Sequence, residues 1–173
     1  MAVRPIVVVP HEALSRKAEE ITDVTEQIRQ LAHDMADTMY RAPGVGLAAN
    51  QVGEPLRLIV VDVDYAYAEP RDKKKQPLFL VNPRICLAEG AETKEEGCLS
   101  VPEFGVEIAR ATSVKVEAID LEGKPITIEA SGLMARALQH EIDHLNGTTV
   151  LDHASALKRT LYHRRLKKKV RSR

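Results

Sequence analysis

The chain has 173 residues, of which 44 % are hydrophobic and 29 % charged. This composition suits one globular domain and excludes a disordered or membrane-embedded chain. Two cysteines cannot build a disulfide scaffold and favour a reducing compartment. The net charge of zero hides an asymmetry: the last ten residues carry seven Lys or Arg and no acid, so the other 163 residues carry 18 basic and 25 acidic groups. Such an acidic body excludes broad nucleic-acid binding, and the basic tail remains to be explained.

No segment has the pattern of a membrane span or a signal peptide, and the apolar run near the start stops at Pro10. We therefore expect a soluble, cytoplasmic protein with no membrane partner. A processed organelle form is the alternative, because a removed transit peptide would leave no trace.

The first part of the chain predicts a helix followed by strands. Asp23 and Glu26 have capping-box spacing, and apolar residues then recur at helical spacing as far as Met39. Residues 41–44 end this helix, and residues 44–51 read as a glycine-rich loop. Three apolar runs then predict strands at 58–63, 78–81 and 85–88.

The second part predicts a hairpin and two helices. Residues 112–120 and 125–130 alternate in polarity around a turn, which is the pattern of paired strands. A helix then runs from Ser131 or Gly132 to Gly147, and a last helix lies within 154–173. This order predicts a single α+β domain over 1–173, with mostly antiparallel sheets around a central helix and a helix towards each end.

The strongest chemical signal is HEIDH at 140–144. His140 and His144 are four residues apart, so on a helix they share one face and can hold one metal ion. Glu141 lies beside such a metal, where it can act as general base on a water molecule. A surface helix with two polar histidines is the alternative interpretation.

A catalytic metal site needs a third protein ligand and one open position. Val150 stands where the metzincin pattern has its third His, and Asp152 comes too soon after His144 to act as a distant carboxylate ligand. The third ligand should therefore lie upstream. Cys98, in the polar run EEGCLS, is the candidate, because a nearby dication would deprotonate its thiol. A buried core position is the alternative for a free cysteine, and it suits Cys86 better.

A third motif is GVGLAANQ at 44–51. Its two glycines suggest a backbone that a ligand can approach closely. It is not a dinucleotide-binding fingerprint, because the G-x-G-x-x-G pattern fails at Ala49, and it lacks the Gly-Lys-Ser/Thr ending of a P-loop. The Gln51 amide is suited to donate a hydrogen bond to an oxyanion, and an ordinary loop of small residues is the alternative.

The segments GVGLAANQ, EGCLS and QHEIDHLNG, in this order and at these separations, closely resemble the three signature motifs of peptide deformylases. The resemblance covers nearly the whole chain. HExxH is shared by many metalloenzymes, whereas its combination with EGCLS upstream is highly specific. The resemblance implies an α+β fold with antiparallel sheets around the helix that carries residues 140–144.

The resemblance also implies the roles of individual residues. It implies one divalent metal ion with three protein ligands, Cys98, His140 and His144. It implies a general base that then acts as general acid, Glu141. It implies two oxyanion donors, the side chain of Gln51 and the backbone N–H of Leu99. It implies substrate-binding residues in the peptide groove and at the methionine pocket, Val45, Gly46, Gly97 and Leu133.

By this resemblance, the protein would remove the formyl group from the formyl-methionine of newly synthesised polypeptides and release formate. The native metal would be Fe(II), and Zn, Ni or Co could occupy the same site. The partners would be N-formylmethionyl nascent peptides, with no DNA. The basic tail would either be a solvated terminal helix or contact ribosomal RNA near the emerging chain.

Two positions depart from the family pattern. Arg136 lies one helical turn before His140, and Lys94 precedes a pair of glutamates, where some relatives carry apolar residues. Their long stems can still pack against apolar surface, so the side-chain preference of the pocket rim stays open. We also expect Arg110 to pair with Glu96 and brace the segment that carries Cys98.

Two other functions remain open at this level. A related metallohydrolase would act on other N-acyl groups or on short peptides. A non-catalytic metal-binding or RNA-binding protein would make the tail its functional part, but a purely structural metal site has no need of Glu141.

Overall fold

The computed structural model describes residues 2–67, 69 and 74–171. Its α-helices are α1 (Glu26–Arg41), α2 (Val63–Tyr67), α3 (Gly132–Leu145) and α4 (Ala156–Arg171). Its 3₁₀ helices are η1 (Glu12–Leu14), η2 (Ala49–Val52) and η3 (Val150–His153). Its strands are β1 (Gly46–Ala48), β2 (Leu58–Val61), β3 (Leu78–Glu89), β4 (Glu92–Cys98), β5 (Val101–Arg110), β6 (Ser113–Ile119) and β7 (Pro125–Ser131). None of the described helices is long and apolar enough to cross a membrane.

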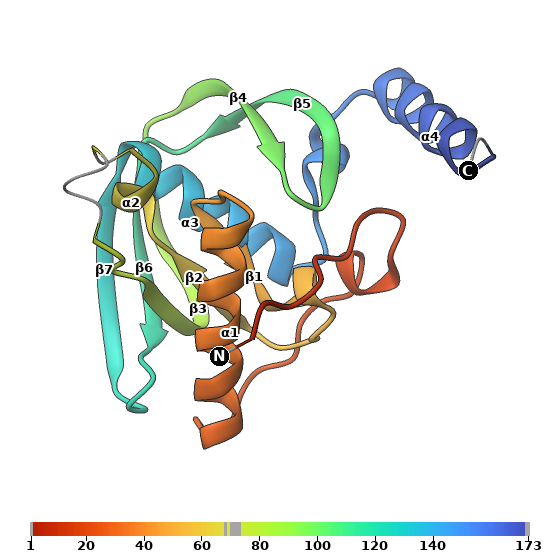
Figure 1. The fold of residues 1–173 in the computed structure, drawn as a ribbon. Helices are drawn as coiled ribbons and strands as arrows, with labels where there is room; N and C mark the ends of the chain where they lie inside the picture. The colour runs from red at the N-terminus through yellow and green to blue at the C-terminus, as the bar shows by residue number, and fades with distance from the viewer. Residues whose placement is uncertain (1, 68, 70–73, 172–173) are drawn as a thin grey trace.

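The described strands form two antiparallel sheets. Five strands pair in the order β1-β2-β3-β6-β7, and β4 pairs with β5 in a separate two-stranded sheet. Helix α1 lies in front of the larger sheet and α3 lies behind it in Figure 1, while α4 stands apart beside β5. The predicted α+β fold, with antiparallel sheets around the HExxH helix, is therefore confirmed.

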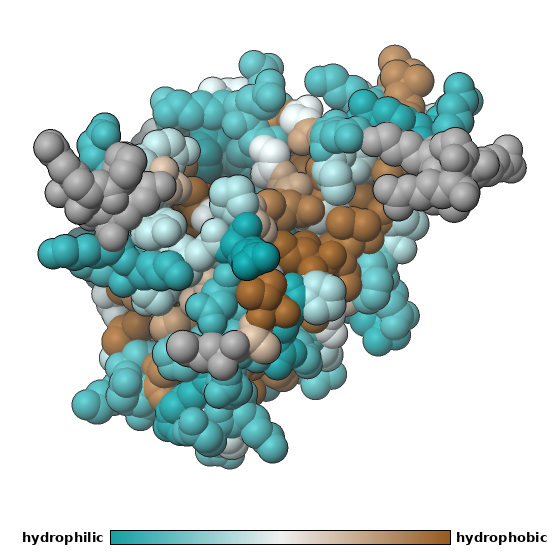
Figure 2. All heavy atoms as spheres, in the orientation of Figure 1, coloured by the Kyte–Doolittle hydropathy of each residue, from teal (hydrophilic) through white to brown (hydrophobic). Residues whose placement is uncertain are grey.

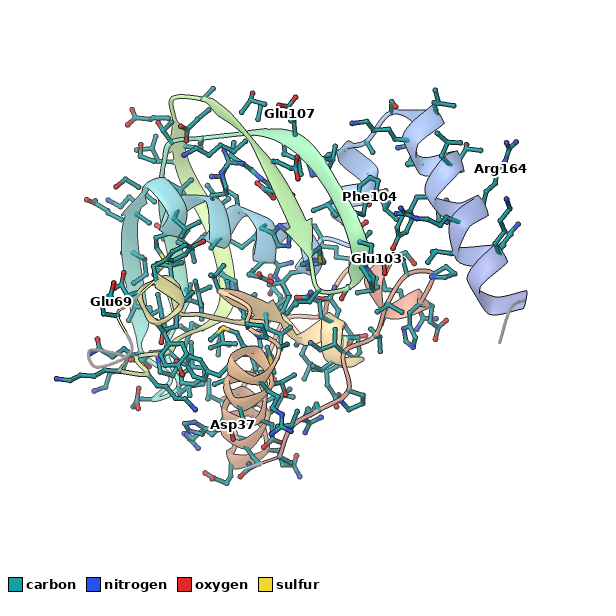
Figure 3. All side chains as sticks on the ribbon, turned by 45° about the horizontal axis from the view of Figure 1, so that its top comes forward. Asp37, Glu69, Glu103, Phe104, Glu107 and Arg164 are labelled. Carbon is teal, nitrogen blue, oxygen red and sulfur yellow. The ribbon has the colours of Figure 1, made fainter. Side chains whose placement is uncertain are left out.

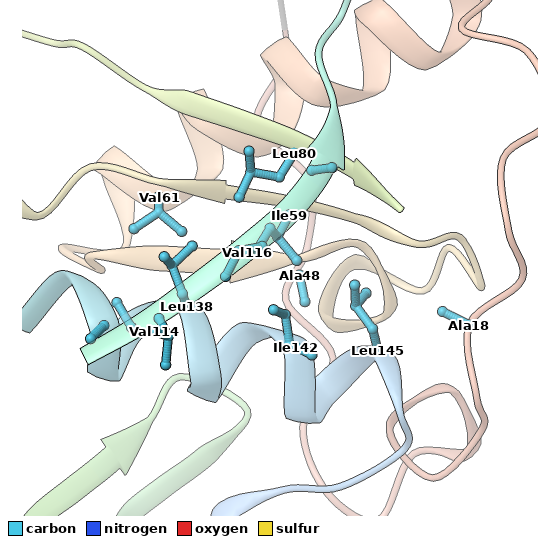
Figure 4. Close-up of a cluster of buried hydrophobic side chains, with 13 residues drawn as sticks. Ala18, Ala48, Ile59, Val61, Leu80, Val114, Val116, Leu138, Ile142 and Leu145 are labelled. Atoms are coloured by element: carbon cyan, nitrogen blue, oxygen red, sulfur yellow. The ribbon is translucent and has the colours of Figure 1, made fainter. Parts of the chain in front are cut away.

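Helix α3 is held against the larger sheet by a buried aliphatic cluster. Leu138, Ile142 and Leu145 point from α3 towards Ile59 and Val116 of the sheet (Figure 4). These side chains are at most 5 % exposed. Burying an aliphatic side chain contributes about 1.5–3 kcal/mol relative to leaving it exposed, so the cluster fixes the position of the helix.

Helix α1 covers the opposite face of the same sheet. Leu31, Met35 and Met39 pack in a second cluster with residues of β1 and β2, as the helical spacing predicts. The predicted N-cap at Asp23 is wrong, because the Thr25 side chain accepts the hydrogen bond from the amide of Ile28. A threonine hydroxyl is one of the preferred N-cap groups, and Thr25 stands directly before the helix, whereas Asp23 lies two residues further away.

Several predicted boundaries need correction. The runs at 78–81 and 85–88 belong to one strand, β3, whose register against β6 shifts twice. The glycine-rich segment at 44–51 is not simply a loop, since it contains β1 and most of η2. The β4–β5 hairpin has no counterpart among the predicted strands, because β4 is mostly charged rather than alternating in polarity. The β6–β7 hairpin and the last helix are as predicted.

Candidate metal centre and active site

Three predicted ligands meet at the centre of the fold. The Nε2 atoms of His140 and His144, one turn apart on α3, lie 3.3 Å from each other. Cys98, the last residue of β4, places its Sγ 3.2 Å from the Nε2 of His144. All three donor atoms lie within 4.8 Å of one another. The separate elements α3 and β4 thus bring together residues that are more than forty positions apart in the chain.

This donor set fits a divalent metal ion. One thiolate and two imidazoles are the ligands of a catalytic site that keeps a fourth position open. The surroundings also favour a cation. Burial disfavours a charged imidazole, but hydrogen bonds to Cys98 and Glu96 outweigh it and raise the pKa of His140 to about 10. To bind a metal through Nε2, His140 has to release this proton, so the proton and the metal compete for the same place.

The carboxylate of Glu96 orients the ligand His140. The Nδ1 atom of His140 lies 2.9 Å from Glu96 Oε2, so this nitrogen donates its proton to the carboxylate and leaves Nε2 facing Cys98. Arg110 donates to both oxygens of Glu96, at 3.0 Å from Nε and 3.1 Å from Nη2. Burial alone would raise the pKa of Glu96, but hydrogen bonds to His140 and Arg110 hold it well below its usual range.

A second guanidinium completes this network. The Nη1 of Arg136 lies 2.7 Å from Glu96 Oε1 and also donates to the carbonyl of Ile108, while Nη2 donates to the carbonyl of Glu92. The remaining nitrogen of Arg110 lies 2.6 Å from Asp143 of α3. Two guanidiniums therefore face two carboxylates, the buried Glu96 and the partly exposed Asp143.

The two positions that depart from the family pattern, Arg136 and Lys94, lie in different surroundings. Arg136 lines the central cavity and at the same time binds Glu96. Lys94 is exposed, pairs with Glu92 at 3.0 Å and does not line that cavity. The expected pairing of Arg110 with Glu96 is present. Cys86 is exposed rather than buried, so the core interpretation of that residue is wrong.

Glu141 is buried beside the ligands and directly against β1. Its side chain is 4 % exposed, and burial raises its pKa to about 7. Among the described residues its Oε2 atom has no hydrogen-bond partner, so this oxygen can accept a proton. A Cβ atom at Gly46 would come within 2.5 Å of Glu141 Oε1, which explains why glycine is required at that position.

Gln51 of η2 turns its amide nitrogen towards the same site. Its Oε1 accepts a hydrogen bond from the backbone of Ala48 at 2.9 Å, which leaves Nε2 3.2 Å from Ser100 Oγ and 3.6 Å from Cys98 Sγ. The neighbouring Asn50 donates its side-chain amide to the carbonyl of His144. Sequence reasoning missed the positioning contacts of Asn50, Ser100 and Asp143. The sequence signal that could have indicated these residues is that each lies within one of the three motifs.

A cavity of about 650 Å³ opens onto these groups. Figure 2 shows brown apolar side chains gathered near the middle of this face, among polar surroundings. The cavity is lined by nine of the ten predicted site residues, Val45, Gly46, Gln51, Gly97, Cys98, Leu99, Leu133, His140 and Glu141. The tenth, His144, is 1 % exposed and lies behind its two partner ligands.

Comparison with known proteins agrees with this geometry. Residues 3–160 match the family model described as polypeptide deformylase. The chain belongs to the peptide deformylase family. It is 45 % identical to the peptide deformylase of Brucella suis over 97 % of this chain and 94 % of that protein. Relatives of the same name in Rhizobium meliloti and Acinetobacter baumannii are 42 % and 45 % identical over the whole of this chain.

Solved structures show the same fold. A peptide deformylase from Legionella pneumophila superposes with a TM-score of 0.87 at 44 % identity, covering 98 % of this chain and 96 % of that one. The peptide deformylase of Ehrlichia chaffeensis in complex with actinonin has a TM-score of 0.88 at 40 % identity, with 98 % of both chains covered. This deformylase is thus a metal-dependent hydrolase that removes the N-terminal formyl group from nascent polypeptides.

The Arg136 contacts generate a first prediction. Replacing Arg136 with Leu leaves one oxygen of Glu96 and two backbone carbonyls without this donor, so the free energy of unfolding should fall by about 2–4 kcal/mol. Metal affinity should fall roughly tenfold, because Glu96 then holds His140 less firmly. Denaturant unfolding and chelator competition measure the two effects.

The matched control is Arg84→Leu, because Arg84 makes an exposed ion pair with Glu117 at 3.2 Å. Loss of that pair should cost less than about 1 kcal/mol and leave metal affinity unchanged. Equal effects of the two substitutions would show that Arg136 contributes no more than a surface charge.

Proposed function

We propose that Cys98, His140 and His144 hold one divalent metal ion, natively Fe(II), and that Zn, Ni or Co can replace it. The clustering of one thiolate and two imidazoles supports the ligand set. These ligand types suit both Fe(II) and Zn, and the family resemblance favours Fe(II). Metal analysis of protein purified without oxygen distinguishes them. When bound, the metal supplies Lewis acidity to the formyl oxygen and acidity to a coordinated water.

We propose that Glu141 moves the protons of the reaction. Its burial and the absence of a partner on Oε2 support this role, because such a carboxylate exchanges protons near neutral pH. Glu141 accepts a proton from the attacking water and then donates it to the departing amine of methionine. Gly46 leaves the space in which this side chain lies.

We propose that Gln51 and Leu99 stabilise the oxyanion formed at the formyl carbon. The Gln51 amide is held at its oxygen by Ala48, so its N–H groups are oriented before substrate arrives. Leu99 directly follows Cys98 and lines the same cavity, which supports a role for its backbone N–H in binding the oxyanion. Each such donor contributes about 2.7–4 kcal/mol to transition-state stabilisation in related chemistry.

We propose that the peptide lies between β1 and β4. The cavity is lined from these two sides by Val45, Gly46 and Gly97. Gly97 has no side chain that would project into the space for the peptide. The methionine side chain occupies the apolar part of the cavity, beside Leu133 and along the stem of Arg136. Leu133 is 40 % exposed and belongs to none of the core clusters of the described residues, so its side chain is available for this contact. The formyl group is small, so a narrow reacting centre excludes larger acyl groups.

The single observation that carries the mechanism is the buried Glu141 beside the three clustered donors. Glu141→Ala should keep the metal but lose formate release from formyl-Met-Ala-Ser by at least about a hundredfold, because general acid–base catalysis contributes 10²–10⁴-fold. Metal content and formate release are measured on the same samples. Unchanged turnover would remove Glu141 from the mechanism.

The substrate control is acetyl-Met-Ala-Ser. The wild-type enzyme should cleave it far more slowly than the formyl peptide. The reason is that the acetyl group carries a methyl group at the position where the formyl group has only a hydrogen atom. An acetyl peptide that proved the better substrate would favour a different N-acyl hydrolase.

We propose that the whole chain works as one catalytic domain in the cytoplasm, and that the basic C-terminal segment docks it to the ribosome. Helix α4 carries Arg164 and other exposed basic residues, and it lies beside β5 at the outside of the fold (Figure 1). A basic helix is suited to phosphate-rich RNA. Residues 172–173 of this segment lie outside the described residues.

Deleting residues 164–173 tests the docking role. Co-sedimentation with ribosomes should weaken and become less dependent on salt, because fewer phosphate contacts release fewer counterions. Turnover of formyl-Met-Ala-Ser should remain intact. Co-sedimentation that is unchanged across salt would leave the segment as a solvated helix end.

A further inference from the structure

A second hollow adjoins the active-site cavity. It has a volume of about 400 Å³ and lies between β5 and α4. Its lining residues are Glu103, Phe104, Gly105, Lys158, Leu161, Tyr162 and Arg165. Glu103 and Phe104 also line the active-site cavity, so the two hollows meet at these residues. Figure 3 shows both side chains at the edge of β5 that faces α4.

The wall made by α4 is fixed to β5 rather than loosely placed. The hydroxyl of Tyr162 donates to the carbonyl of Pro102 at 3.0 Å, and its ring meets that of Phe104 edge-on at 5.0 Å. Arg165 donates to the carbonyl of Glu103 at 2.7 Å and lies over the Tyr162 ring. These contacts set the distance between the helix and the strand, so the hollow has a defined shape.

The side chains that line this hollow combine apolar and charged groups, with two basic residues, Lys158 and Arg165, against one acidic residue, Glu103. Leu161 is 53 % exposed, although it is a large aliphatic residue, and Lys158 is exposed one turn before it. Across the hollow, Phe104 is half-buried. The hollow therefore offers apolar contact next to an ammonium group, which suits a peptide segment with an apolar and an acidic side chain.

We propose that this hollow is a downstream subsite for the formylated polypeptide, and that it takes a segment several residues after methionine. The inference rests on the proposed function, because the N-terminal formyl group must lie at the metal centre for the chain to continue over Phe104. An extended chain rises about 3.3 Å per residue, so a peptide of about eight residues spans roughly 26 Å, and the two hollows adjoin at Glu103 and Phe104. Lys158 then pairs with an acidic side chain of that segment.

The test compares formylated peptides on the metal-loaded enzyme. One is formyl-Met-Ala-Ser, and the others are peptides of about eight residues that carry leucine and either glutamate, glutamine or lysine at successive downstream positions. At low salt, the best glutamate peptide should show a kcat/KM about three- to fivefold above its glutamine version, mainly through KM. The lysine version should fall below both, and added salt should reduce these differences.

The decisive variant is Lys158→Glu, and its matched control is Lys167→Glu. Lys167 lies nine residues later, which places it about 180° around α4 on the side facing away from the hollow. Both lysines are exposed, so neither substitution disturbs the core. Lys158→Glu should reverse the order of the glutamate and lysine peptides, while Lys167→Glu should keep it, and neither should change turnover of formyl-Met-Ala-Ser.

Each outcome bears on the proposal. Equal kcat/KM for the glutamate, glutamine and lysine peptides at every position would overturn the subsite. Equal effects of the two substitutions would also overturn it, by showing a response to net charge alone. A wild-type enzyme that released no formate from the tripeptide would overturn the proposed function itself, which separates that failure from failure of the subsite.

Discussion

The buried carboxylate of Glu96 is the interaction on which the metal centre depends. It accepts from the Nδ1 of His140 and from the guanidiniums of Arg110 and Arg136, which come from different elements of the fold. An unpaired buried carboxylate would cost several kcal/mol, and these partners together keep it charged. The charged carboxylate in turn fixes the His140 tautomer. The Glu96 carboxylate of β4 thus connects helix α3 with strand β5.

Packing against the larger sheet determines where Glu141 and Gln51 lie. Aliphatic packing holds α3 at a fixed distance from β1, and at that distance only a glycine at position 46 leaves space for Glu141. The same packing places η2 beside the end of α3, where Asn50 binds the carbonyl of His144 and Gln51 faces the cavity. Core packing therefore determines both where the ligands lie and where the proton-transfer group lies.

Sequence reasoning recovered what is local or carried by a motif. The spacing of His140 and His144 predicted one helix face, and alternating polarity predicted the β6–β7 hairpin. It failed where tertiary pairing outweighs local pattern. Strand β4 is mostly charged and is a strand because it pairs with β5, with Glu96 turned inward to two arginines. Nor does any local pattern show that Arg136 crosses to Glu96, since that contact joins residues forty positions apart.

The role of Glu96 in holding the metal centre is tested by the metal affinity of the Glu96→Gln variant, with Glu117→Gln as control because Glu117 lies in an exposed ion pair. The glutamine keeps the size of the side chain but removes the charge that both arginines and His140 require. We expect metal affinity to fall by about 10- to 100-fold in Glu96→Gln and to stay at the wild-type value in Glu117→Gln. Wild-type affinity in a folded Glu96→Gln protein would contradict this role.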